Sequence, residues 1–155
     1  MALDVDVRVV GDVEHDLRDR ATGELELRPV LARHGVSYKA LAEVEFTGDS
    51  QGVIFAQGSR FGGHALYVKD GSLTYAYNFL GIPPETRIAA AAPTSGRHVV
   101  GVEFTKERMG EHHESYGPLK LWVDDEVVAE QEIRTMTGHF TLCESPVNSA
   151  SASAL

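Results

Sequence analysis

The stretch that decides the fold is "HALYVKDGSLTYAYNF", residues 64–79. From Leu73 to Phe79, large apolar side chains alternate with small or polar ones, which is the pattern of a half-buried strand. The dipeptide Asp70-Gly71 separates this segment from "HALYVK", and both residue types tolerate the positive φ that a two-residue hairpin turn needs. The stretch therefore predicts an antiparallel hairpin, and we expect one row of its second strand to face the core. That row is Leu73, Tyr75, Tyr77 and Phe79.

Further strands are predicted on both sides of this hairpin. Their segments are "YKALAEVEF" (38–46), "VIFAQ" (53–57), "RHVVGVEFTKE" (97–107), "LKLWV" (119–123) and "VVAEQEI" (127–133). We expect "GIPPETRIAAAAPTSG" (81–96) to be a long connection and "RMGEHHESYGP" (108–118) to be a polar loop. Antiparallel strands with alternating faces must pack as two sheets or close into a barrel. The predicted fold is all-β: an antiparallel β-sandwich of the jelly-roll or concanavalin-A-like type.

The chain divides into three predicted parts. Residues 1–33 form a charged, weakly structured leader, within which "LDVDVRVV" (3–10) alternates as a strand does. Residues 34–143 form the sandwich. Residues 144–155, mostly small and polar, form a disordered tail.

Composition excludes several classes of function. The chain of 155 residues has the length of one domain, and its net charge of −9 disfavours nucleic-acid binding. No apolar run approaches the roughly 18 residues that a membrane span needs, and the first residues lack the pattern of a signal peptide. Cys143 is the only cysteine, which excludes an internal disulfide and a cysteine-rich zinc site. We expect a cytoplasmic protein with no nucleic-acid or membrane partner.

Three long segments carry a family resemblance. They are "GVIFAQGSRFGGHALYVKDGSLTYAYNFLGIPPE" (52–85), "GRHVVGVEFTKERMGEHHESYG" (96–117) and "LKLWVDDEVVAEQEIRTMTGHFTLC" (119–143). Together they resemble the C-terminal domain of bacterial arylsulfatases, over roughly residues 35–143. The resemblance implies a lectin-like β-sandwich that is appended, in that family, to a larger catalytic domain. It implies sulfuric ester hydrolysis by the parent enzyme, not by this domain.

The sequence lacks the residues that carry the catalytic chemistry of that family. A sulfatase matures its nucleophile from a Cys/Ser-x-Pro-x-Arg motif and surrounds a calcium ion with Asp, Asn and His. "CESPV" at Cys143 has its proline three positions on and no following arginine, so we reject it. We predict no catalytic residues and no cofactor. The chain is either a gene remnant or a true stand-alone module.

Two groups of residues are candidates for ligand binding. Arg60 with the backbone around Gly62, Gly63 and His64 can form a nest for a sulfate or phosphate, or the glycines can form a tight strand connection or bulge. Trp122 is a candidate contact residue, because its same-face neighbours on the strand are polar.

A metal site is a second kind of candidate. Glu111, His112 and His113 are ligand types that suit zinc, but adjacent histidines in an extended segment point to opposite sides. The alternative is a solvated loop. His98, on an apolar row, is expected to be a buried, hydrogen-bonded histidine at a strand end.

Three functions are compared in order. The first is a non-catalytic accessory domain that packs against a sulfatase catalytic domain or against itself. The second is a lectin-like module that binds a glycan or a sulfated small molecule, for which the tyrosine row is either a stacking platform or part of the core. The third is a small hydrolase, which we do not expect to show turnover.

Overall fold

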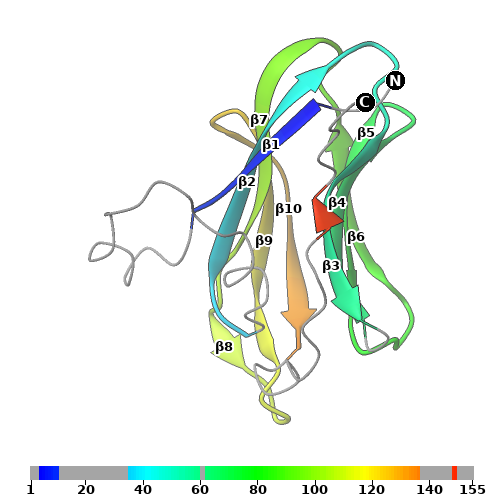
Figure 1. Ribbon diagram of the computed structural model, residues 1–155. Helices are drawn as coiled ribbons and strands as arrows, with labels where there is room; N and C mark the ends of the chain where they lie inside the picture. Colours follow the sequence, from blue (N-terminus) through cyan, green and yellow to red (C-terminus); the bar gives the residue numbers. More distant parts are fainter. Residues whose placement is uncertain (1–3, 11–34, 60–61, 137–147, 150–155) are drawn as a thin grey trace, which may run out of the picture.

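The computed structural model describes residues 4–10, 35–59, 62–136 and 148–149, and these residues form two antiparallel sheets that lie in two layers (Figure 1). No helix occurs among them. In sheet A the strand order is β1 (Asp4–Val10), β2 (Tyr38–Phe46), β7 (Gly96–Phe104), β9 (Ser115–Val123) and β10 (Glu126–Thr135), with β8 (Arg108–Met109) pairing β9. In sheet B it is β11 (Asn148–Ser149), β3 (Gly52–Ser59), β4 (Gly62–Lys69), β5 (Ser72–Asn78) and β6 (Thr86–Ala91).

One hydrophobic core fills the space between the two layers. In β2 buried side chains alternate with more exposed ones, as a strand with one face on the core requires. Both sheets contribute large side chains that are almost completely buried: Phe46, Phe104, Leu119 and Leu121 from sheet A, and Phe55, Leu66, Leu73 and Tyr75 from sheet B. The predicted all-β class with two antiparallel sheets is confirmed, and the arrangement is consistent with a β-sandwich.

The central hairpin forms as its sequence predicts. His64 pairs with Tyr77 and Val68 with Leu73, and the turn has φ of 50° at Asp70 and 73° at Gly71. The predicted inward row is buried at Leu73, Tyr75 and Tyr77, while Phe79 is half-buried.

Two predicted connections contain strands. The segment 81–96 includes edge strand β6, in which only Ile88 is buried. Its alanines have low strand propensity, so pairing with β5 decides its structure rather than local preference. The segment 108–118 includes β8 and the start of β9.

The parts outside the predicted sandwich also contribute strands. Strand β1 pairs with β2 along its whole length, and β11 pairs with β3 at Ala56 and Phe55. The remaining leader and tail positions lie outside the described residues, so the predicted domain boundaries remain predictions. No helix in the described part of the chain is long and apolar enough to cross a bilayer.

The sandwich has two ends that differ in character. The first end, here named the β8 end, contains the start of β4, the end of β5 and the β8–β9 hairpin (Figure 1). Two hydrogen bonds of 2.8 Å join the sheets near this end, from Tyr38 to Tyr75 and from Met136 N–H to the Tyr77 hydroxyl. At the opposite end, here named the turn end, lie the turns 47–51, 70–71 and 92–95.

Gly101 tests the packing on the outer face of sheet A. A Cβ at this position in β7 would press on the Ala40 carbonyl oxygen and approach Leu41 Cδ2 to 2.7 Å. We expect Gly101→Ala to lower the free energy of unfolding by about 1–3 kcal/mol, measured by urea denaturation. Gly48→Ala is the control, because a Cβ there meets nothing within 4 Å, and it should change stability by less than about 0.5 kcal/mol. Equal stability of the two variants would contradict the close packing.

Candidate functional site

His64, a predicted ligand-binding residue, lies in the core and is 6% exposed. Its Nδ1 lies 3.0 Å from the Tyr75 hydroxyl and its Nε2 3.3 Å from Gln57 Oε1. The Tyr75 hydroxyl in turn lies 2.8 Å from that of Tyr38, so a chain of polar groups crosses from sheet B to sheet A. Four aromatic rings surround the imidazole edge-on at centroid distances of 5.7–6.3 Å: Tyr38, Phe55, Tyr75 and Tyr77.

Burial keeps the tyrosine hydroxyls of this cluster protonated. Desolvation raises the pKa of Tyr77 to about 12, and it also raises the pKa values of Tyr38 and Tyr75 well above the ordinary value. A protonated phenol donates and accepts hydrogen bonds but does not act as a general base. The cluster therefore serves to join the two sheets.

Gly62 and Gly63 bring three strands close together. A Cβ on Gly62 would collide with the Asn78 carbonyl oxygen, and a Cβ on Gly63 would collide with the backbone of Gln57 and Gly58. Their position favours the interpretation as a tight strand connection. Arg60 lies outside the described residues, so an anion nest at this point remains a prediction.

The buried Glu114 carboxylate organises the loop that holds Glu111, His112 and His113. It accepts the His112 backbone N–H at 2.9 Å and the Tyr116 hydroxyl at 3.1 Å. Bonds to the backbone, its own N–H first, lower the pKa of Glu114. The side chains of Glu111, His112 and His113 are exposed, and among the described residues no three His, Cys, Asp or Glu side chains are placed to hold one metal ion. The structure thus shows no convergence of the predicted ligands.

Trp122 lies half-buried on the outer face of sheet A. Lys39 Nζ sits 3.8 Å from the ring centroid and pairs with Glu103 at 3.1 Å. The indole Nε1 is buried and has no hydrogen-bond partner in the described part of the chain. Lys39 thus covers one face of the Trp122 ring, and the role of Trp122 as a contact residue remains a prediction.

His98 and Asp124 form an ion pair at the turn end. His98 Nδ1 lies 2.9 Å from Asp124 Oδ2, and its Nε2 lies 3.0 Å from the Ser95 carbonyl oxygen. The other Asp124 oxygen accepts the Val99 N–H at 3.1 Å. The nitrogen that would act as a base in a catalytic Asp-His pair is thus used by the Ser95 carbonyl, which only accepts. The prediction of a hydrogen-bonded histidine is confirmed, although its side chain remains 29% exposed.

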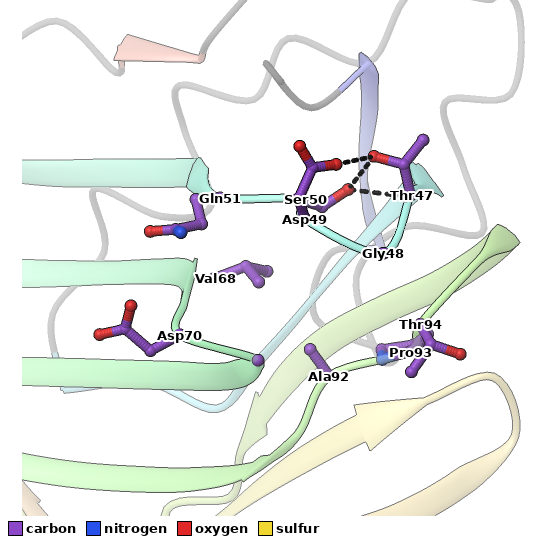
Figure 2. A pocket seen from close by; sticks show the side chains of 11 residues that line it. Thr47, Gly48, Asp49, Ser50, Gln51, Val68, Asp70, Ala92, Pro93 and Thr94 are labelled. Atoms are coloured by element: carbon purple, nitrogen blue, oxygen red, sulfur yellow. Dashed lines mark hydrogen bonds between the residues drawn. The ribbon is translucent and has the colours of Figure 1, made fainter.

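A pocket of about 260 Å³ opens at the turn end, between three turns (Figure 2). Figure 2 shows Gln51 and Asp70 on the strand side, Ala92, Pro93 and Thr94 opposite, and Val68 between them. Sequence analysis missed this site because its walls come from three separate segments, 47–51, 68–71 and 92–94. The only local signals were turn residues, which do not indicate that the turns meet.

No family model, no curated protein and no solved structure matches this chain. The resemblance to arylsulfatases therefore remains an expectation from the sequence.

Removing the middle hydroxyl of the polar chain should cost more than removing its end. Tyr75→Phe leaves both Tyr38 and the His64 Nδ1 without this partner, so we expect a loss of about 1–3 kcal/mol in the free energy of unfolding. Tyr38→Phe keeps the bond between Tyr75 and His64 and should cost only about 0.5–1.5 kcal/mol. Urea denaturation measures both, and an equal or reversed order would contradict the chain.

The ion pair at the turn end should make stability depend on pH. The bond to Asp124, followed by the bond to the Ser95 carbonyl, raises the pKa of His98, while His98 lowers the pKa of Asp124. The histidine's contribution is complete below its ordinary pKa of about 6.5 and is lost as pH rises through the raised value. The aspartate's contribution is present above about 3.9 and is lost as pH falls through the lowered value.

Asp124→Asn should therefore lower the pKa of His98, measured by NMR titration of the imidazole C–H protons. It should also reduce stability most between about pH 4 and 6.5. Asp125→Asn, in the same turn, is the matched control and should leave the pKa of His98 unchanged. An unaltered His98 titration in the Asp124 variant would refute the pairing.

Proposed function

We propose that the chain is a non-catalytic accessory module: a jelly-roll β-sandwich, similar to the C-terminal domain of bacterial arylsulfatases, that docks onto a separate catalytic domain through its β8 end. Hydrolysis of the sulfuric ester belongs to that partner. The support comes from where the resembling segments and the exposed apolar side chains lie.

Three stretches within the resembling segments lie at one end of the sandwich. The start of β4, the connection after β5 and the β8–β9 hairpin are far apart in the sequence, yet all three lie at the β8 end (Figure 1). Residues 79–85 form the longest connection between consecutive strands in the described part of the chain, longer than the turns 47–51, 70–71 and 92–95 at the opposite end. Long connections on a rigid sandwich are the usual place for recognition surfaces.

Exposed apolar side chains are the observation that carries the proposal. The two most exposed large apolar residues of the described chain are Met109, at 56%, and Ile82, at 50%. Both belong to the β8 end. Next to Met109 in β8, Arg108 pairs with Glu132 at 2.7 Å and lies 4.0 Å from the centre of the Tyr116 ring. Apolar side chains near fixed polar groups are typical of a docking surface.

The use of two of the histidines, His64 and His98, supports a module without its own chemistry. Both ring nitrogens of His64 and both of His98 are engaged with side chains or backbone of the sandwich itself. Each imidazole thus serves the fold and is not presented to a substrate.

A binding experiment tests docking. The purified chain is titrated by calorimetry into the catalytic domain of a bacterial arylsulfatase prepared without its own C-terminal domain. We expect a complex that the double variant Met109→Ser/Ile82→Ser weakens at least tenfold, because about 1.4 kcal/mol of apolar contact would be lost. The chain alone should release no sulfate from an aryl sulfate.

Val53→Ser is the matched control, because Val53 is exposed to 42% on the outer side of sheet B, away from the β8 end. It should leave binding unchanged. The proposal fails if no complex forms at about 100 µM, if the control variant weakens binding as much as the double variant, or if the chain alone hydrolyses the ester. Dimer formation through the same two residues, seen by sedimentation, would support self-association instead.

A further inference from the structure

We infer that the pocket at the turn end binds a small, neutral, polyhydroxylated ligand of the size of one sugar ring. The inference is independent of the proposed docking, because the pocket lies at the opposite end of the sandwich. It rests on the rigidity of the walls, the chemistry of the polar groups and the sign of the charge.

The upper wall of the pocket is a turn held by its own hydrogen bonds. The Thr47 N–H donates to Ser50 Oγ at 2.7 Å, and the Ser50 N–H donates to the Thr47 carbonyl at 2.9 Å. The two hydroxyls lie 3.1 Å apart, and Ser50 is only 8% exposed. Figure 2 shows dashed lines from Ser50 Oγ to the Thr47 N–H and hydroxyl, and a third from the Thr47 hydroxyl to Asp49 at 3.2 Å. The turn is therefore shaped before any ligand arrives.

The other walls are also fixed. The Ala92 N–H donates to the Gly71 carbonyl at 2.9 Å, which fastens the segment after β6 to the β4–β5 turn. Asp70 adopts the left-handed backbone conformation in that turn, with φ of 50°. A ligand that enters such a preformed site orders few side chains, so little of its binding energy is lost.

Three polar side chains around the pocket have no partner among the described residues. Asp70 offers a carboxylate, Gln51 an amide and Thr94 a hydroxyl. A carboxylate accepts two O–H groups from neighbouring hydroxyls of a sugar, whereas an amide and a hydroxyl each donate and accept. Val68, Ala92 and Pro93 supply apolar surface for the C–H face of the ring. This mixture suits a polyol.

The charge of the lining selects against anions. Among the described residues, the lining includes the carboxylates of Asp70 and of Asp49, the second of which accepts the Thr47 hydroxyl, and no lysine, arginine or histidine. A sulfated or phosphorylated ligand would therefore be repelled, and a neutral sugar is favoured over the sulfated ligand considered from the sequence. A volume of about 260 Å³ lies just below the roughly 300–1,000 Å³ of drug-sized pockets, so the occupant is small.

NMR titration of the full chain tests the inference. Amide shifts are followed while glucose, galactose, mannose or N-acetylglucosamine is added in separate experiments, with glucose 6-sulfate and calcium chloride as parallel arms. We expect at least one neutral sugar to give saturable shifts centred on Ser50, Gln51, Gly71 and Ala92, with a dissociation constant near 1 mM, which corresponds to about −4.1 kcal/mol. The sulfated sugar should bind more weakly.

Two variants at the site are compared with a control outside it. Asp70→Asn keeps the left-handed turn, because asparagine tolerates positive φ, and it should weaken binding at least fivefold, as should Gln51→Ala. Glu130→Gln makes the same charge change on the exposed part of β10 and should have no effect. Shifts that appear only with calcium, stronger binding of the sulfated sugar, saturable shifts away from the pocket, or none with any neutral sugar would each overturn the inference.

Discussion

The hydrogen bond between the Tyr38 and Tyr75 hydroxyls is the contact on which the arrangement of the two sheets depends. It joins sheet A to sheet B inside a largely apolar core, together with the bond from Met136 N–H to the Tyr77 hydroxyl, and His64 extends it across sheet B. Each of these polar groups is buried, so the loss of one hydrogen-bond partner would lower the free energy of unfolding more than the loss of a partner at the surface would. A slip of two residues in β2 or β5 would keep the same face on the core but would separate the two hydroxyls. The polar chain thus selects one register where apolar packing alone would tolerate others.

Local chemistry determined how much of this fold the sequence could predict. The hairpin 64–79 was predicted because its turn dipeptide and its alternation lie within one short segment. Strand β6 was missed, because alanines carry no strand signal and only the neighbouring β5 gives them their partners. Strand β8 was missed for a similar reason, since two residues in a polar segment show no period.

The candidate functional residues also divide into those with a local sequence signal and those that depend on distant parts of the chain. The choice between a nest and a tight connection at Gly62 and Gly63 depended on where Gln57 and Asn78 lie, which no local pattern contains. His112 and His113 look like ligands by type, but their loop is organised by Glu114, a residue that the sequence analysis had not selected. The pocket was not predicted at all, because three turns must meet to form it. The two ends of the sandwich are therefore distinguished only by the folded chain, one by its apolar residues and the other by its polar cavity.

The position of Trp122 has a further consequence. It is the only tryptophan in the chain, so all indole fluorescence originates from the outer face of sheet A, beneath the Lys39 ammonium group. A cation held 3.8 Å from the ring centre alters the energy of the excited state, and so does the exclusion of water from the indole nitrogen. The emission spectrum is thus an intrinsic optical reporter of that face, sensitive to anything that displaces the lysine.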